Sequence, residues 1–273
     1  MVSAWRETAA QSADTGLQKR CEEVTEGLST WDLEALRLTS QAQCVPLDEL
    51  DRLLHSFRFG KREDPWQKVD LAKIEATRAA LEVEVKGQKA AIKAVCDVLM
   101  SARASLSIDG ASTNRPKGRL FFVGPTGVGK TETARTLARN LFGNDRSFRR
   151  FDMSEFQQEH SAERLTGAPP SYIGFEAGGE LTNWIRDNPF SVILFDEVDK
   201  AHPRVLDRFL QVLDDGRLTD ARGQTVSFAQ SILIFTSNYG ATSRDGRSAP
   251  PVAPDMDYDE VAAHFRQAVE QHF

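Results

Sequence analysis

Cysteine is scarce in this sequence of 273 residues, and an excess of basic over acidic residues is missing. The three cysteines, Cys21, Cys44 and Cys96, are an odd number at wide spacing without a Cys-x-x-Cys pair, which indicates reduced thiols in a cytoplasmic protein. The formal net charge of −6 provides no basic surplus to neutralise a phosphate backbone. This composition argues against nucleic acid as the main partner.

Long hydrophobic runs are missing as well. The longest apolar runs, such as residues 191–195 and 232–235, are too short to span a bilayer. The N-terminal sequence MVSAWRETAAQSADTG has no basic region followed by an apolar one, so we expect neither a secretory signal nor a membrane partner. Hydrophobic residues at 40% and charged residues at 27% are typical of a globular protein with one sizeable core and a smaller appendage.

The N-terminal part is polar, helix-prone and without recognisable chemistry. A helix is expected to begin near Trp31, and the leucines within residues 47–57 share one helical face. We therefore predict a helical or partly disordered region of unknown role over residues 1–64. A linker helix, opened by Pro65, is expected over residues 65–80. Its apolar stripe would contain Trp66, Val69, Ile74 and Leu81.

Short apolar runs alternate with helical patterns over residues 81–273. The expected strands cover residues 120–123, 148–152, 192–195 and 232–236. The expected helices cover residues 90–106, 130–142, 179–188, 203–213 and 259–272. Short apolar strands between helices predict an α/β fold in which a parallel sheet is sandwiched by helices. Two shorter runs, residues 217–219 and 225–228, are typical of a hairpin.

One segment matches the P-loop pattern G-x-x-x-x-G-K-[ST]. It lies between an expected strand and an expected helix and contains Gly124, Pro125, Thr126, Gly127, Val128, Gly129, Lys130 and Thr131. Glycines allow successive backbone N–H groups to turn towards phosphate oxygens, and the following helix points its N-terminus at the anion. The pattern predicts ATP as the ligand, with Lys130 at the β- and γ-phosphates and the Thr131 hydroxyl at Mg²⁺.

Two acids follow the expected strand 192–195, at the sheet edge where ligands bind in parallel sheets. Beside a P-loop, Asp196 is predicted to hold Mg²⁺, directly or through water, and Glu197 to accept a proton from the attacking water. Alone, the pair would be ordinary solvated acids. If the strand at residues 232–236 lies between the other two, Asn238 is predicted to orient the water; without the other motifs it would be a plain turn residue.

Longer strings between about Leu81 and Asn238 resemble the second ATPase module of the Clp unfoldases, which are ring-forming AAA+ ATPases. The strings are FDMSEF at residues 151–156, GAPPSYIGFE at residues 167–176, DEVDKAHP at residues 196–203 and LQVLDDGRLTD at residues 210–220. The resemblance implies a P-loop NTPase fold of the AAA+ type with ATP and Mg²⁺ as cofactors. It also implies that ATP hydrolysis drives polypeptide through a central pore.

The same resemblance assigns roles to two segments. The loop with Tyr172, Ile173 and Gly174 would line the pore and grip the substrate, since an aromatic ring contacts any side chain with little preference. A tyrosine packed in a core loop is the alternative. Val85 lies in a segment similar to the adenine-contacting segment of the family, although Lys86 stands where an apolar residue is usual. The implied partners are unfolded or tagged protein substrates, like subunits in a hexameric ring, and a protease.

The resemblance stops before two further parts of the family. The string with the arginine finger would follow Phe273, and a small helical lid would follow that string. Residues 81–273 would therefore form the large ATPase subdomain without its lid, in a chain that is either a fragment or a natural short relative. The alternative function is a nucleotide-dependent binding or regulatory module with little hydrolysis of its own.

Overall fold

The computed structural model describes residues 30–43, 53, 64–107, 115–172, 175–239, 260, 261, 263, 265 and 267. The chain divides into two compact units, residues 1–64 with 105–112 and residues 65–104 with 113–273. In the first unit, helix α3 (Thr30–Gln43) begins near the predicted position, and the side chains of Leu36 and Leu53 are fully buried. The rest of the helical face predicted at residues 47–57 lies outside the described residues. The predicted division into an N-terminal region, a linker and an ATPase subdomain stays a prediction.

The stretch predicted as one linker helix forms two elements instead. A 3-10 turn, η2 (Pro65–Lys68), precedes helix α5 (Leu71–Glu84). The Asp70 side chain accepts a hydrogen bond of 2.7 Å from the Lys73 backbone N–H. The helix therefore begins after this cap and not at Pro65. The predicted apolar stripe is buried in the second unit: Trp66, Val69, Ile74 and Leu81.

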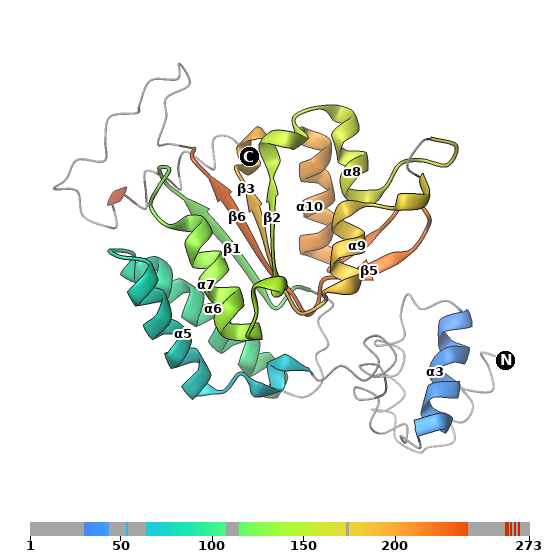
Figure 1. The fold of residues 1–273 in the computed structure, drawn as a ribbon, viewed down its shortest axis with the longest axis horizontal. Coiled ribbons are helices and arrows are strands. Elements are labelled where there is room, and N and C mark those ends of the chain that lie inside the picture. The colour runs from blue at the N-terminus through green and yellow to red at the C-terminus, as the bar shows by residue number, and fades with distance from the viewer. Residues whose placement is uncertain are drawn as a thin grey trace. The chain divides into compact units, whose positions relative to one another are not determined.

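A four-stranded parallel sheet forms the centre of the second unit, in the order β1–β6–β3–β2 (Figure 1). The strands are β1 (Gly118–Val123), β2 (Phe148–Asp152), β3 (Val192–Asp196) and β6 (Ile232–Ser237). All four agree with the predicted strands. Every side chain of β3 and β6 is buried, as the continuous apolar runs of a parallel sheet require. Because β6 lies between β1 and β3, the arrangement needed for the predicted role of Asn238 is present.

Helices cover both faces of this sheet (Figure 1). One face carries α5, α6 (Lys89–Ser107) and α7 (Lys130–Phe142), and the other carries α8 (Ala162–Thr166), α9 (Glu180–Asp187) and α10 (Pro203–Asp215). Under α9 and α10, the ring of Phe195 stacks between those of Phe151 and Phe235, with centroids 5.8 and 5.1 Å away. The predicted α/β fold with a sandwiched parallel sheet is confirmed.

A hairpin follows α10, as predicted. Its antiparallel strands are β4 (Arg217–Thr219) and β5 (Thr225–Ser227). Short 3-10 turns join the main elements: η3 (Asp145–Ser147), η4 (Met153–Phe156), η5 (Glu159–Ser161), η6 (Phe175–Ala177) and η7 (Val198–Lys200). Of the helix predicted at residues 259–272, the described residues Glu260, Val261, Ala263, Phe265 and Gln267 are helical. Across the described ranges, no helix is both long and apolar enough to cross a bilayer.

Candidate functional site

The P-loop leaves β1 at Gly124 and enters α7 at Lys130. Gly127 and Gly129 have left-handed backbone conformations, with φ of 80° and 97°, which residues with a side chain rarely adopt. A methyl group on Gly129 would also lie 2.9 Å from Cγ1 of Val85. The two glycines therefore allow the backbone to turn tightly just ahead of the helix.

The N-terminus of α7 presents backbone donors to this loop. Its N-cap residue, Gly129, offers no side-chain hydrogen bond. The first backbone bond within the helix runs from the Thr133 N–H to the Gly129 carbonyl at 2.8 Å. The N–H groups of Lys130, Thr131 and Glu132 therefore precede the first intrahelical bond. N–H groups at the positive end of a helix dipole fit an anionic group such as phosphate.

The ammonium group of Lys130 lies across the same loop. It donates to three backbone carbonyls and one side chain: those of Gly124, Pro125 (3.1 Å) and Ser237 (3.3 Å), and Oδ1 of Asn238 (2.7 Å). Burial lowers the pKa of Lys130, and nearby carboxylates, Asp196 foremost, act in the opposite direction. Phosphate oxygens are stronger acceptors than these carbonyls, so an incoming phosphate can take over the ammonium group.

Asp196 is buried at the end of β3. Its Oδ1 accepts a hydrogen bond from the Thr236 hydroxyl on the neighbouring strand β6. Its Oδ2 lies 3.5 Å from the Thr131 hydroxyl and 2.8 Å from Nε of Arg150. The two residues predicted as Mg²⁺ ligands, Thr131 and Asp196, are therefore adjacent, and their oxygen atoms suit this ion.

Asn238 links Lys130 to Glu197. Its Nδ2 donates to Oε1 of Glu197 at 3.0 Å, while its Oδ1 accepts from Lys130. The backbone N–H of Glu197 donates to the Thr236 hydroxyl at 3.0 Å, and Glu197 has a left-handed φ of 58°. The structure thus brings Lys130, Asn238 and Glu197 together at the carboxyl edge of the sheet, next to Asp196.

A cavity of about 670 Å³ adjoins the P-loop. Its lining includes Gln88, Ala91, Phe121, Gly129, Lys130 and Phe265. Val85, the predicted adenine contact, is itself buried against Gly129. Apolar walls beside a set of phosphate donors form the kind of pocket that a nucleotide base requires.

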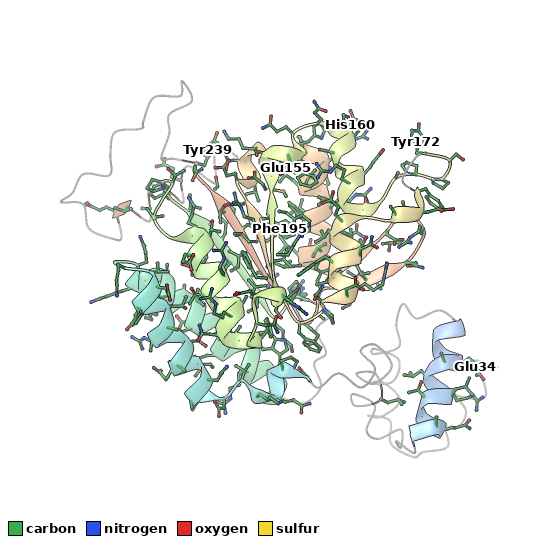
Figure 2. All side chains as sticks on the ribbon, viewed as in Figure 1. Glu34, Glu155, His160, Tyr172, Phe195 and Tyr239 are labelled. Atoms are coloured by element: carbon green, nitrogen blue, oxygen red, sulfur yellow. The ribbon has the colours of Figure 1, made fainter. Side chains whose placement is uncertain are left out.

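The structure keeps Tyr172 apart from the phosphate site. Its side chain is 67% exposed, so the alternative of a tyrosine packed in a core loop is wrong. Figure 2 shows Tyr172 at the edge of the unit, away from Phe195 and Tyr239. Ser171 beside it has a left-handed φ of 76°, a conformation that residues with a side chain rarely adopt. Ile173 and Gly174 lie outside the described residues.

Two residues of the phosphate site had no predicted role. Thr236 bonds both to Asp196 and to the backbone of Glu197. Its hydroxyl at the end of an otherwise apolar strand is a signal that could have indicated this role. Arg150 pairs with Asp196 because β2 lies beside β3. No local sequence pattern predicts the contact between Arg150 and Asp196, because it depends on which strands pair.

Comparisons with known proteins agree with this geometry. Residues 115–273 match the family described as AAA domain (Cdc48 subfamily). The chain is 46% identical to the chaperone protein ClpB of Aquifex aeolicus (strain VF5) over 242 residues, which cover 89% of this chain and 22% of that protein. It is 54% identical to the chaperone protein ClpB of Meiothermus ruber over 193 residues, which cover 71% of this chain and 22% of that protein.

A solved structure is also similar. The S. cerevisiae Hsp104-ADP complex matches with a TM-score of 0.62 and 36% sequence identity, over 76% of this chain and 35% of that chain. This chain therefore spans about a fifth of the length of the curated relatives that it matches.

Proposed function

This chain belongs to the AAA domain family, Cdc48 subfamily, and from that premise we propose that it binds and hydrolyses ATP as a module of a Clp-type protein unfoldase or disaggregase. The observation that carries the proposal is the hydrogen-bonded series Lys130–Asn238–Glu197 beside Asp196. It combines a cation for phosphate, a proton acceptor and a ligand for Mg²⁺ at one edge of the sheet. Phosphoryl transfer to water needs these groups together.

The nucleotide binds with its phosphates on the P-loop. The N–H groups at the start of α7 and the ammonium group of Lys130 bind phosphate oxygens. Thr131 and Asp196 hold Mg²⁺, which supplies positive charge at those oxygens. The base takes the adjoining cavity, where Val85 supports the P-loop. The similar Hsp104 structure is described as an ADP complex, which supports an adenine nucleotide.

Hydrolysis depends on Glu197 and Asn238. The carboxylate of Glu197 accepts a proton from the water that attacks the γ-phosphate. The amide of Asn238 holds that carboxylate through Nδ2 and Lys130 through Oδ1, so it sets the distance between the proton acceptor and the phosphate-binding cation. In this position it orients the attacking water.

Tyr172 is the residue that grips polypeptide. Its exposed ring stands apart from the nucleotide, as a residue that contacts a second ligand should. The curated relatives are described as chaperones, which supports unfolded or tagged proteins as substrates. The full set of partners that we propose includes like subunits in a hexameric ring and a protease, in the cytoplasm.

The test uses the full chain with calorimetric titration of ATP-Mg²⁺ and a phosphate-release assay, each with and without fluorescein-labelled casein as an unfolded polypeptide. We expect ATP binding, and turnover that rises when casein is added. Binding without turnover would favour a nucleotide-dependent binding or regulatory module. A chain that binds no ATP would overturn the proposal.

A further inference from the structure

The loop that carries Tyr172 leaves and re-enters the domain through a narrow neck, which consists of residues 165–167 and 176–179. The two sides of the neck are in backbone contact. A methyl group on Gly179 would lie 2.2 Å from the Leu165 carbonyl oxygen, so any side chain there would force the two sides apart. Glycine at this position therefore allows the two ends of the loop to meet.

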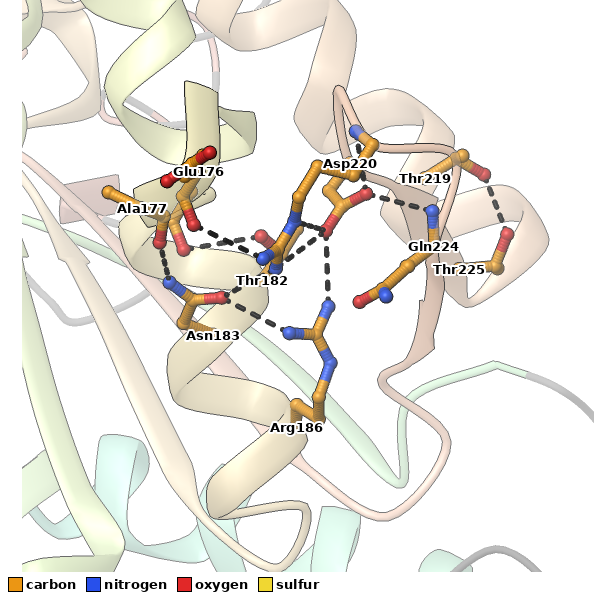
Figure 3. A network of polar contacts seen from close by, with 11 residues as sticks. Glu176, Ala177, Thr182, Asn183, Arg186, Thr219, Asp220, Gln224 and Thr225 are labelled. Atoms are coloured by element: carbon orange, nitrogen blue, oxygen red, sulfur yellow. Dashed lines mark hydrogen bonds and ion pairs between the residues drawn. The ribbon is translucent and has the colours of Figure 1, made fainter. Parts of the chain in front are cut away.

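The turn of the β4–β5 hairpin, residues 220–223, bonds to both sides of this neck. Figure 3 shows the polar network around Asp220 of this turn and the side of the neck with Glu176 and Ala177. On one side, the Ala221 N–H donates to the Thr166 carbonyl at 2.9 Å. On the other side, Nη1 of Arg222 donates to the Glu176 carbonyl at 3.4 Å. One turn thus bridges the segment that enters the loop and the segment that leaves it.

Asp220 fixes the shape of this turn. Its side chain is fully buried, and its Oδ1 accepts hydrogen bonds from the N–H groups of Arg222 (3.0 Å) and Gln224 (2.8 Å). Its Oδ2 pairs with Arg186 at 3.1 Å and with Arg222 at 3.4 Å. Burial acts to raise the pKa of Asp220, but the Gln224 N–H and the two guanidinium groups outweigh burial and lower it. The charged carboxylate therefore holds Arg222 against the neck.

Arg222 and Arg186 share Asp220 but differ in what else they reach. Nη2 of Arg222 would lie 2.7 Å from a methyl group on Gly178, so the guanidinium group covers the neck directly. Arg186 donates to Oδ1 of Asn183 at 3.2 Å, an atom that Nη2 of Arg222 also reaches at 3.4 Å. Among the hydrogen bonds of the described residues, none joins Arg186 directly to the neck, which it reaches only through Asn183, a donor to the Ala177 carbonyl at 2.7 Å. The two arginines thus form a natural pair of test and control.

We propose that residues 220–223 are a clamp on the neck, and that Arg222 is a positioning residue which holds Tyr172 in place to grip polypeptide. This proposal rests on the proposed function of Tyr172. The hairpin continues directly from α10, which follows Glu197 in the chain. The clamp therefore joins the loop that carries Tyr172 to the part of the chain that follows Glu197, the proposed proton acceptor.

The experiment compares Arg222→Ala with Arg186→Ala in the full chain, because each variant removes one cation from Asp220 and one donor from Asn183, but only the first removes a direct contact to the neck. Hydrogen exchange of the amides of residues 175–178 is measured. Arg222→Ala is expected to speed this exchange at least about tenfold, the equivalent of one hydrogen bond from a charged group. Arg186→Ala is expected to change it by less than about threefold.

Two further measurements separate the clamp from other effects. Casein should bind about tenfold more weakly to Arg222→Ala, while calorimetric ATP affinity stays within about twofold, since the nucleotide site shares no contact with Arg222.

If Arg222→Ala lowers the unfolding temperature of the whole chain, Arg222→Gln replaces it. This variant keeps a polar side chain of shorter reach that cannot form an ion pair with Asp220, and a rise of exchange in the same amides is again expected.

Several outcomes would overturn the clamp. The first is that the amides of residues 175–178 exchange hydrogen at the wild-type rate in both Arg222 variants. An equal rise in Arg222→Ala and Arg186→Ala is another, because it would reflect only the lost charge beside Asp220. A different result bears on the proposed function alone. If Tyr172→Ala binds casein like the wild-type chain while Arg222→Ala still loosens the neck, the clamp stands and the gripping role of Tyr172 fails.

Discussion

The phosphate site and the neck of the Tyr172 loop both hold polar groups in fixed positions, but they do so by opposite means. At the phosphate site, Asp196, Thr236 and Asn238 stand at the ends of adjacent strands, whose pairing sets their separation. At the neck, glycines allow the backbone segments to meet and a turn from elsewhere fastens them. The phosphate site thus lies at the ends of rigid strands, whereas the Tyr172 loop is held by a few polar contacts that can break and re-form.

The strongest test of this contrast is Glu197→Gln. Gln keeps an oxygen to accept from Asn238 but cannot take a proton, so we expect ATP binding to persist while phosphate release falls by about 10²- to 10⁴-fold. Glu159→Gln is the control, since this exposed acid has an ion pair with Arg204 and lies outside the phosphate site. Turnover at the wild-type rate in Glu197→Gln would show that another group accepts the proton.

Lys130→Ala should have the next largest effect. The variant removes the half-buried cation at the P-loop, and we expect ATP to bind at least about a hundredfold more weakly, as when one partner of a buried charge pair is removed. Calorimetry measures this. Lys93→Ala, which removes an exposed lysine of α6 that does not line the cavity, should leave the affinity within about twofold. Equal affinities for the Lys130 variant and the wild-type chain would contradict the assignment.

Thr236→Val tests how much the hydrogen bonds of the Thr236 hydroxyl stabilise the edge of the sheet at which the phosphate site lies. Val has the same shape but leaves the buried Asp196 carboxylate and the Glu197 N–H without their shared hydroxyl, which should cost about 1–3 kcal/mol of unfolding free energy. Chemical denaturation monitored by tryptophan fluorescence measures the loss. An unchanged unfolding free energy would mean that water replaces the hydroxyl at no cost.

The smallest effect is expected at Ser171. Its left-handed φ of 76° is unfavourable for a residue with a side chain. Ser171→Gly should therefore raise the unfolding free energy, by about 0.5 kcal/mol after the greater flexibility of the unfolded chain is subtracted. The same denaturation experiment detects it, with Ser154→Gly as a control outside the loop. If Ser171→Gly instead lowers the unfolding free energy, the backbone conformation of Ser171 is not a source of strain.

The sequence was sufficient to predict the features that local pattern determines. The four strands of the sheet are short apolar runs, and the P-loop is a continuous string, so each prediction needed only neighbouring residues. The start of α5 was wrong because Pro65 and Asp70 both favour a helix start, and the side-chain cap of Asp70 prevails. The five-residue helix α8 (Ala162–Thr166) is too short to produce a helical period.

The remaining features depend on contacts between distant segments. Arg150 reaches Asp196 only because β2 pairs with β3. The clamp similarly requires that a hairpin turn pack against a neck formed by residues 165–167 and 176–179. The sequence shows Arg222 and Asp220 as ordinary turn residues, since nothing local distinguishes a buried carboxylate from a solvated one.

Among the described strands of the central sheet, the one that the ribosome makes last, β6, lies between two strands made earlier. Strands β1, β2 and β3 all precede β6 in the chain, yet among the described strands β1 has no neighbour except β6. Pairings between segments so far apart form slowly. No strand pairing therefore connects the P-loop to Glu197 on the nascent chain until Ile232–Ser237 has been made. The chain therefore becomes able to bind nucleotide only late in folding. ATP can stabilise only a chain in which β6 has already paired with its neighbouring strands.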